Sequence, residues 1–237
     1  MTWVVAHRGA SGHAPENTMR AFRLAAEMGA DAIELDVHRT ADGELAVIHD
    51  DTLDRTTDRT GAVASLAMAE IREANAGDGE GVPTLGEVLA WLPDDLGLVV
   101  EIKARAAVDE IVAAVSAHDV HRSGRASIIS FDEASIERVR ELDPTLTTGY
   151  LLVPGQPIPA ALEWATQHGH AGVHPWEGDL GLDPAPILAQ AMAYGRRVGC
   201  YVVDEPDRMK HLAAYGLWGF VTNLPDVGRT ALGPRGD

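Results

Sequence analysis

The sequence predicts a (β/α)8 barrel with a small insertion after the second strand, and three observations support this prediction. Short β-branched runs alternate with helix-period segments, which is typical of a parallel sheet covered by helices. Eight such runs occur along the chain. The length of 237 residues suits one closed barrel, since barrels of this kind have about 200–250 residues. An open doubly wound sheet is the alternative, but it usually has fewer strands and a glycine-rich first turn, and His7-Arg8-Gly9 is not such a turn.

The predicted strands and helices follow one another in regular order. In chain order the strands are Trp3–Ala6, Ala32–Val37, Leu98–Lys103, Ala126–Phe131, Thr148–Val153, Ala171–His174, Val198–Val203 and Gly219–Thr222. The helices have apolar residues near i, i+3 and i+4. They are Thr18–Met28, Val108–Ala117, Ala134–Leu142, Ala160–Gln167, Ala185–Tyr194 and Asp207–Tyr215. Several of them end in a glycine just before the next strand, as expected where a left-handed residue closes a helix.

Residues 38–83 interrupt this order and are expected to form a hairpin and an insertion within a single domain that spans residues 1–237. Asp42-Gly43 lies between two strand-like runs and predicts a two-residue hairpin loop. The returning strand is antiparallel, so it cannot be one of the parallel barrel strands. With this loop, Asp36 faces His49 across the hairpin, which places His49 at the end of the second strand.

The segment after the hairpin, from Asp50 to Pro83, has little apolar periodicity beyond Leu66–Ile71. We therefore expect an excursion over the barrel mouth rather than a second domain. Thr84-Leu-Gly-Glu87 is a capping box, and it predicts a helix that runs through Trp91.

Composition and charge exclude several classes of protein. Apolar residues make up 46% and charged residues 23% of the chain, so the chain can form a core and is not mainly disordered. There are 36 acidic against 19 Lys and Arg residues. The formal charge of −17 argues against binding to nucleic acid or to an anionic membrane. Cys200 is the only cysteine, which excludes an internal disulfide and a thiolate cluster. Met1 to Ala6 lack a basic region and their apolar run breaks at His7 and Arg8, so we do not expect this segment to be a secretory signal. No apolar stretch of the sequence is long enough to span a membrane. These features predict a cytoplasmic protein.

Polar residues end the first three predicted barrel strands, where barrel active sites lie. Glu34 and Asp36 share one face of their strand, and so do Glu101 and Lys103, because alternate residues of a strand point the same way. Their apolar neighbours are expected to face the helices. Three carboxylates aimed into a barrel mouth repel one another without a cation. The pattern therefore predicts a hard divalent ion with oxygen ligands, Mg²⁺ or Ca²⁺.

Two histidines and two basic residues surround this predicted metal site. His7 and His49 can work as an acid and base pair near neutral pH, but their spacing does not say which is the acid. Arg8 offers a planar fork for phosphate oxygens and Lys103 a point charge. Together with a divalent ion, they would leave the site slightly positive, which suits a phosphodiester monoanion.

A series of short motifs covers nearly the whole chain. They are His7-Arg8-Gly9, Pro15-Glu16-Asn17-Thr18, Glu34-Leu35-Asp36-Val37, His49-Asp50-Asp51-x-Leu53-x-Arg55-Thr56-Thr57, Pro83-Thr84-Leu85, Glu101-Ile102-Lys103, Ser130-Phe131 and Thr222-x-x-Pro225-Asp226. Through these motifs the sequence closely resembles the bacterial glycerophosphodiester phosphodiesterase family. The resemblance implies a (β/α)8 barrel with an insertion after the second strand. It also implies metal-dependent hydrolysis of glycerophosphodiesters to glycerol 3-phosphate and an alcohol, with a role in lipid and glycerol metabolism.

The resemblance also implies roles for individual residues. Those implied as metal ligands are Glu34, Asp36 and Glu101, and those implied as the catalytic pair are His7 and His49. Phosphate contacts are implied for Arg8 and Lys103. Glu16 and Asn17 are implied to shape the site, and Asp51 to lie near the metal. In this family the neighbouring glycerol hydroxyl can act as the nucleophile, which gives a cyclic phosphate that water then opens.

Two segments depart from the family pattern. Tyr201-Val202-Val203-Asp204 stands where the family often has Trp-Thr-Val-Asn, and Thr222-Asn223 stands where it often has Thr-Asp. Both are expected to lie away from the catalytic group and to alter the pocket for glycerol and the leaving alcohol. Tyr201 is expected either to stack beside the glycerol or to serve in packing.

Other functions stay open. The same machinery could cleave lysophospholipids if the mouth carried an apolar groove, for which the candidates are Ile158–Trp164, Trp176, Leu180 and Leu182. The barrel could also bind a phosphorylated ligand without catalysis, although both histidines and all three carboxylates are present. A metal-dependent aldolase or isomerase would have less need of paired histidines. The sequence does not choose the alcohol or the ion, nor decide between a monomer and a homodimer.

Overall fold

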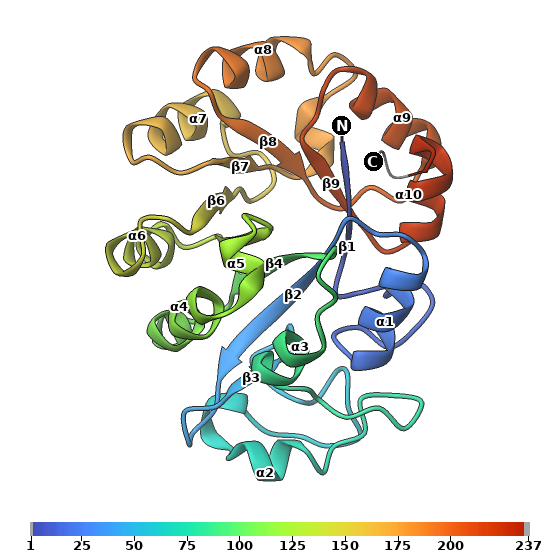
Figure 1. The fold of residues 1–237 in the computed structure, drawn as a ribbon, viewed down its shortest axis with the longest axis vertical. Helices are drawn as coiled ribbons and strands as arrows, with labels where there is room; N and C mark the ends of the chain where they lie inside the picture. The colour runs from blue at the N-terminus through green and yellow to red at the C-terminus, as the bar shows by residue number, and fades with distance from the viewer. Residues whose placement is uncertain (1, 235–237) are drawn as a thin grey trace.

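Eight parallel strands close into a ring in the computed structural model, which describes residues 2–234 (Figure 1). The strands of the ring are β1 (Trp3–Ala6), β2 (Ala32–Arg39), β4 (Gly97–Ile102), β5 (Ala126–Ser130), β6 (Thr147–Leu151), β7 (Gly172–His174), β8 (Arg197–Cys200) and β9 (Gly219–Thr222). The ring closes because β1 pairs with both β2 and β9. The predicted (β/α)8 barrel is thereby confirmed.

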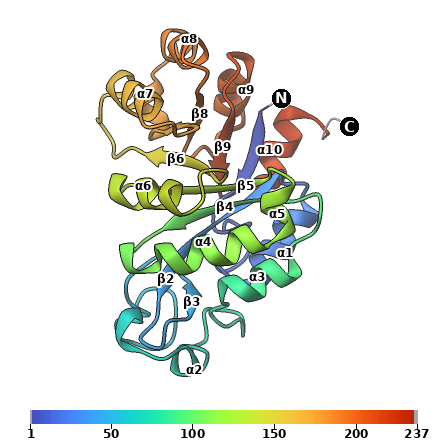
Figure 2. The ribbon, with the colours of Figure 1, turned by 60° about the vertical axis from the view of Figure 1, so that its left-hand side comes forward.

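Helices surround the ring on its outer side (Figures 1 and 2). They are α1 (Met19–Glu27), α3 (Leu85–Trp91), α4 (Val108–Ala117), α5 (Asp119–Arg122), α6 (Glu133–Leu142), α7 (Ile158–Gln167), α8 (Ala185–Ala193), α9 (Pro206–Ala214) and α10 (Pro225–Leu232). The capping box predicted at the start of α3 is present, since Thr84 and Glu87 bond to each other's backbone N–H groups. The helix α10 was not predicted; it begins with a proline and contains Gly228. A Cβ at Gly228 would lie 2.8 Å from the Val4 side chain, so α10 needs this glycine to pack on β1.

Alternate residues of each strand point to the helices and into the ring, as the two-residue period of a strand predicts. Outward residues such as Ile33, Leu35 and Val100 join the apolar cluster formed with the helices. Inward residues such as Val5 and Val99 form a smaller cluster inside the ring. On β2 and β4, the small or apolar inward residues Ala32 and Val99 are followed by the inward carboxylates of Glu34, Asp36 and Glu101 towards the carboxyl ends, where the site lies.

One layer inside the ring is made by His174 and two glycines. His174 is buried at the end of β7, and burial lowers the pKa of its imidazole to about 4. A Cβ at Gly149 or at Gly199 would lie 2.5 Å from a nitrogen of this ring. Because these positions of β6 and β8 are glycines, they leave the space that the imidazole fills.

The hairpin after β2 differs from the prediction by one residue. β3 (Leu45–Val47) is antiparallel to β2, as expected, but Val37 pairs with Val47 and His38 with Ala46. The loop has three residues, 41–43, because Thr40 uses its backbone N–H and its side chain to bind Glu44. The expected pairing of Asp36 with His49 is therefore wrong, and the N–H of Ile48 donates to the Asp36 carbonyl instead.

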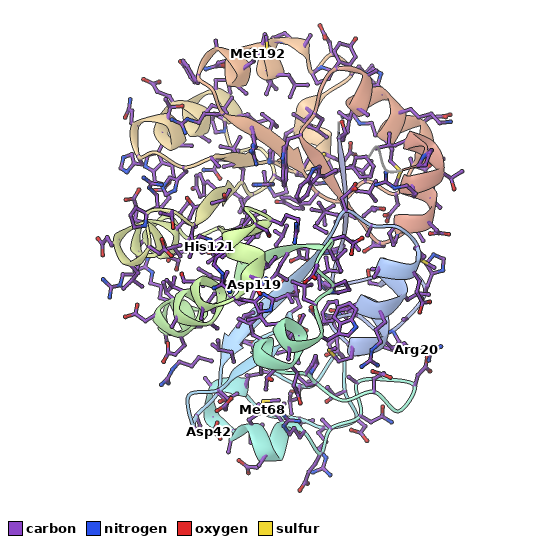
Figure 3. The ribbon with its side chains drawn as sticks, viewed as in Figure 1. Arg20, Asp42, Met68, Asp119, His121 and Met192 are labelled. Carbon is purple, nitrogen blue, oxygen red and sulfur yellow. The ribbon has the colours of Figure 1, made fainter. Side chains whose placement is uncertain are left out.

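The insertion after β3 has its own cluster of buried apolar residues, among them Leu53, Val63 and Ile71. It includes α2 (Met68–Ile71) and lies beside the end of β2. Asp42 ties the hairpin loop to it, since its carboxylate accepts from the N–H of Met68 at 3.1 Å. Figure 3 shows these two residues next to each other. The insertion is thus anchored at both the hairpin and the barrel.

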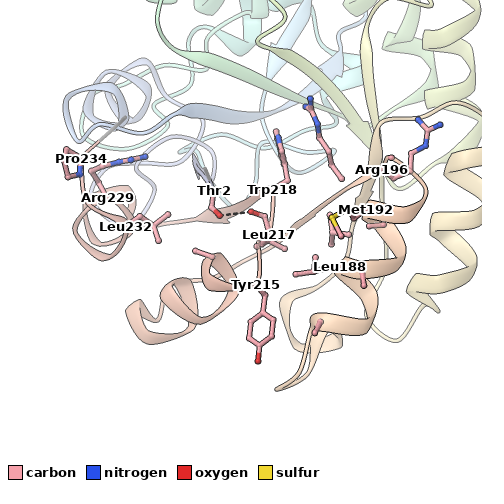
Figure 4. A pocket seen from close by; sticks show the side chains of 18 residues that line it. Thr2, Leu188, Met192, Arg196, Tyr215, Leu217, Trp218, Arg229, Leu232 and Pro234 are labelled. Carbon is pink, nitrogen blue, oxygen red and sulfur yellow. Dashed lines mark hydrogen bonds between the residues drawn. The ribbon is translucent and has the colours of Figure 1, made fainter. Parts of the chain in front are cut away.

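The opposite end of the barrel carries a groove of about 840 Å³ between α8, α9 and α10 (Figure 4). Leu188, Met192 and Leu232 line it, and Thr2 donates to the Leu217 carbonyl at its wall. It lies at the amino ends of the strands, so it is separate from the polar carboxyl ends. Among residues 2–234, no helix has the length and apolar character to span a bilayer.

Candidate active site

Three carboxylates converge at the ends of β2 and β4. Glu34 and Asp36 come from β2 and Glu101 from β4, where Asp36 and Glu101 are direct parallel neighbours. All three are buried, and one oxygen from each lies within 4.8 Å of the other two. Burial, together with the charges of Asp36 and Glu101, raises the pKa of Glu34 well above its usual value. Burial and the Asp36 charge raise the pKa of Glu101 to about 7. The cluster therefore concentrates negative charge that a cation would relieve.

The donor atoms of this cluster suit a hard divalent cation. All of them are carboxylate oxygens, which Mg²⁺ and Ca²⁺ prefer. Asp36 Oδ1 is buried and accepts no hydrogen bond, although the ammonium group of Lys103 lies 3.5 Å away. A buried carboxylate oxygen without a donor is the feature expected of a metal ligand. Asp51, which the resemblance places near the metal, is exposed and is not part of the cluster.

The loop after β1 holds this cluster in place. The backbone N–H of Arg8 donates to Glu34 Oε2 at 2.9 Å, and the Asn17 amide donates to Asp36 Oδ2 at 2.8 Å. Arg8 and Asn17 both have φ near +55°, in the left-handed region that residues other than glycine seldom adopt. Gly9 is required here because a Cβ would lie 2.6 Å from the backbone of Ala21.

A chain of ion pairs runs from Arg8 to His49. Glu16 Oε1 lies 2.8 Å from both Arg8 Nη1 and Arg55 Nη2. Arg55 also binds Asp50 through two nitrogens, and Asp50 Oδ1 lies 2.7 Å from His49 Nδ1. Burial alone would raise the pKa of Glu16, but hydrogen bonds from Arg55 and the charge of Arg8 lower it to about 2. The insertion that carries His49 is thus connected to the loop that carries Arg8.

His7 stands at the end of β1 and is bound from β9. Its Nδ1 lies 2.7 Å from Asn223 Oδ1, and Asn223 in turn donates from Nδ2 to Asp204 at 2.7 Å. Burial and the charge of Arg8 lower the pKa of His7. The imidazole is therefore held in its neutral form over a wider range of pH than a free histidine.

Lys103 and Tyr201 complete the set of predicted site residues. Lys103 Nζ lies 2.8 Å from Glu101 Oε1. Burial opposes its charge, yet Glu101 and Asp36 raise its pKa overall. The Tyr201 hydroxyl donates to the Leu152 carbonyl at 2.5 Å, and its ring meets Phe131 edge to face. Tyr201 is half-buried at the mouth against the inner apolar cluster.

The structure joins the predicted metal, histidine and phosphate residues through the contacts described above, and it corrects the expectation for the segments that depart from the family pattern. The segments that depart from the family pattern were expected to lie away from the catalytic group, and this is wrong because Asn223 binds His7 and Asp204 binds Asn223. Arg55 and Asp50 had no predicted role, although both belong to the longest of the family motifs. The contact of Asn223 with His7 had no signal in the sequence, since it arises from the pairing of β1 with β9, 216 residues apart.

The residues suggested for an apolar groove at the mouth divide into two groups. Ile158 and Leu180 are buried, so they cannot line an open groove. Trp176 and Leu182 are exposed, and Phe131 and Val153 add to them at the ends of neighbouring strands. The mouth therefore has exposed apolar side chains on the side of β5 to β8, across from the carboxylates of β2 and β4.

Comparisons with known proteins agree with this site. The model of the glycerophosphoryl diester phosphodiesterase family matches residues 7–227. A glycerophosphodiester phosphodiesterase of Caldanaerobacter subterraneus is 34% identical, and the match covers 95% of this chain and 96% of the relative.

Solved structures match over the whole barrel. A glycerophosphodiester phosphodiesterase of Agrobacterium tumefaciens has a TM-score of 0.85 at 29% identity, with 97% of this chain and 100% of that chain covered. A phosphodiesterase of Oleispira antarctica, solved with the product sn-glycerol-3-phosphate, has a TM-score of 0.85 at 26% identity, with 98% and 97% covered.

Proposed function

The chain belongs to the glycerophosphoryl diester phosphodiesterase family, and from this premise we propose that it hydrolyses glycerophosphodiesters to sn-glycerol 3-phosphate and an alcohol. The observation that carries the proposal is the buried cluster of Glu34, Asp36 and Glu101, with His7 and His49 tied to the loops around it. The product that the Oleispira phosphodiesterase contains supports the choice of substrate.

In this proposal Glu34, Asp36 and Glu101 hold a divalent cation, Mg²⁺ or Ca²⁺. Such an ion supplies positive charge to the phosphoryl oxygens as negative charge develops on them. Arg8 and Lys103 border the same carboxylates, so they are the groups available to bind the phosphate. Glu16 orients Arg8 and Asn17 orients Asp36, and Tyr201 offers an aromatic face to the glycerol moiety.

We assign the two histidines by the groups that hold them. His7 is bonded to a neutral amide and its pKa is lowered, so it suits the base that takes a proton from the attacking hydroxyl. The Nδ1 of His49 lies 2.7 Å from a carboxylate oxygen of Asp50, which orients the ring. We assign His49 the remaining role, that of the acid: as the attacking oxygen bonds to phosphorus and the bond to the leaving oxygen breaks, His49 gives its proton to the leaving alcohol.

The test is release of sn-glycerol 3-phosphate from glycerophosphocholine and glycerophosphoethanolamine by the purified protein, with Mg²⁺, with Ca²⁺ and with chelator. We expect metal-dependent release that disappears in His7→Ala and in His49→Ala. The variant Asp78→Asn is the control, because Asp78 is exposed and its ion pair is with Arg20, outside the carboxylate cluster. A folded, metal-loaded protein that releases nothing from either compound would contradict the proposal and favour a binding protein without catalysis.

One observation favours a second candidate, the cleavage of lysophospholipids by the same groups. Phe131, Val153, Trp176 and Leu182 expose apolar surface at the mouth, where an acyl chain would lie. In the same assay lysophosphatidylcholine would then release lysophosphatidic acid and choline. Replacement of Trp176 and Leu182 by serine would raise KM for the lysophospholipid and leave KM for glycerophosphocholine unchanged.

A further inference from the structure

Asn223 uses every polar atom of its side chain in a contact that joins His7 to the barrel. Its Oδ1 lies 2.7 Å from His7 Nδ1 and accepts from the Ser11 hydroxyl at 2.9 Å. Its Nδ2 donates to Asp204 Oδ2 at 2.7 Å. Asp204 is itself fixed, since its Oδ1 accepts from the backbone N–H of Asn223 and from the Thr222 hydroxyl, each at 2.8 Å.

These contacts determine which way the amide of Asn223 points. A carboxylate has no proton to donate, so the atom of Asn223 that faces Asp204 must be the NH₂ group. The carbonyl oxygen then faces His7 and Ser11. Because that oxygen can only accept, the proton of a neutral His7 must be on Nδ1, and Nε2 keeps its lone pair. The opposite amide orientation would place two acceptor oxygens together at Asp204.

We propose that Asp204 and Asn223 are positioning residues that hold His7 in the tautomer with the proton on Nδ1. The inference rests on the proposed function, in which His7 acts as the base, and it explains how that base keeps Nε2 free to accept a proton. The side-chain contacts of the two residues are with each other, His7, Ser11 and Thr222, and not with the carboxylate cluster. Arg8, Asp36 and Glu16 act on His7 through their charges, whereas only a hydrogen-bonding partner selects between the two ring nitrogens.

The contacts suggest an exchange of side chains as the test. In Asp204→Asn the carboxylate is lost, so the Asn223 amide can point either way and the tautomer of His7 is no longer fixed. In the double variant Asp204→Asn/Asn223→Asp every contact can form again: the amide at 204 accepts from Thr222 and donates to the carboxylate at 223, which accepts from His7 and Ser11. The matched control is Asp207→Asn, because Asp207 is 99% exposed.

We expect Asp204→Asn to lower kcat by at least about tenfold, as losses of orienting partners commonly do, with KM little changed. The double variant should recover most of this loss, and Asp207→Asn should behave as the wild type. The ¹⁵N NMR signals of the His7 imidazole should show a proton on Nδ1 in the wild type and in the double variant, and a mixture of tautomers in Asp204→Asn.

Unchanged kcat in Asp204→Asn, or a His7 signal that is the same in all variants, would overturn the inference. A double variant as impaired as the single one, with its His7 tautomer also mixed, would do so too. The NMR measurement needs no turnover, so it decides the tautomer even if the wild type hydrolyses no glycerophosphodiester. Failure of the proposed function is thus distinguished from failure of this inference.

Discussion

The two histidines of the site differ in the group that holds Nδ1. An amide holds His7 and a carboxylate holds His49. Burial and the charge of Arg8 lower the pKa of His7, although its hydrogen bond with Asn223 opposes this shift. In the proposed mechanism His7 is therefore the base, and His49 takes the remaining role, that of the acid.

Replacing Asp50 by asparagine should slow catalysis more than it weakens binding. The variant removes the carboxylate beside His49 and weakens the pairing that Asp50 makes with Arg55. We expect kcat with glycerophosphocholine to fall by about 10–100-fold, the range for lost orienting partners. Steady-state kinetics across pH 5–9 checks this, with Asp54→Asn, an exposed neighbour on the same insertion, as control. An unchanged kcat would show that His49 does not depend on Asp50.

Replacing Glu34 by glutamine should have opposite effects on the protein with and without its metal. Glu34 is buried among like charges, so a neutral isostere relieves repulsion and should raise the melting temperature in chelator. The same change removes one of the three proposed metal ligands, so the increase in melting temperature on adding Mg²⁺ or Ca²⁺ should shrink.

Differential scanning calorimetry with and without the ion measures both effects of the Glu34 variant. Glu141→Gln is the matched control, because Glu141 is exposed and pairs with Arg138 on its own helix. A variant that gains as much from the ion as the wild type would exclude Glu34 as a ligand.

At the scale of single residues, the sequence predicted best the neighbours that share one face of a strand. Glu34, Asp36, Glu101 and Lys103 could be placed together because they are alternate residues near the ends of strands. The contact of Asn223 with His7 could not be predicted, because it depends on how the first and last strands of the ring align. Arg55 could not be placed for a similar reason, since its position depends on the path of the insertion.

One layer of β6, β7 and β8 combines a large side chain with two glycines, which leave space for it. His174 lies where Gly149 and Gly199 leave room for its ring. Neither glycine has a positive φ, so space rather than backbone conformation explains them. The layer can therefore accept a smaller residue at 174 more easily than a larger one at either glycine.

Gly149→Ala should consequently destabilise the fold by about 1–3 kcal/mol, the usual cost of overpacking a core. Gly86→Ala provides the contrast: Gly86 is exposed within α3, and a Cβ there meets only Thr84 Oγ1 at 3.8 Å. That variant should stabilise the protein by about 0.5–1 kcal/mol. Urea unfolding of both variants tests the pair, and a Gly149→Ala variant as stable as the wild type would refute the account of this layer.

At the scale of elements, the hairpin shows where prediction from local sequence stops. Asp42-Gly43 correctly predicted a tight turn and an antiparallel strand. The register depended on Thr40, whose side chain binds Asp42 and Glu44 and so enlarges the loop by one residue. The insertion then binds this loop through Met68, a contact between segments that the sequence did not relate.

For the whole molecule, His174 links stability to pH. Its pKa is about 4 in the folded protein and near 6.5 when unfolded, so between these values the unfolded chain binds more protons. Protonation then favours unfolding, and the unfolding free energy should fall as the pH drops from 6.5 to about 4. The contribution of this one residue is about 3 kcal/mol, because one pKa unit corresponds to about 1.4 kcal/mol.

The difference between the wild type and His174→Phe isolates this contribution from that of other titrating groups. Denaturant unfolding at several pH values should show a wild-type stability that declines more steeply below pH 6.5 than that of the variant. Parallel pH profiles for the two proteins would show that His174 titrates normally in the fold. If His174→Phe is too crowded to fold, His174→Asn serves the same comparison.

The overall architecture was the most predictable level, because eight repeats of one pattern support it. An error of a few residues in one strand, as at the end of β8, leaves the count and order of the others unchanged. The closing contact of the ring was implied by the count alone. The site was only partly predictable: its location followed from the architecture, but its hydrogen bonds did not.

In a closed ring of strands, only the position of the chain ends decides which strand comes first. β1 and β9 are neighbours, and Thr2 and Pro234, near the two ends of the chain, line the same groove. A gene in which a short linker joins these ends and new ends open at the exposed turn around Gly155 should therefore encode the same barrel. Such a circular permutant would start with α7 and keep every strand between the neighbours it has now. If the permutant retains activity, the site depends on the closed ring and not on the order in which the strands follow one another along the chain.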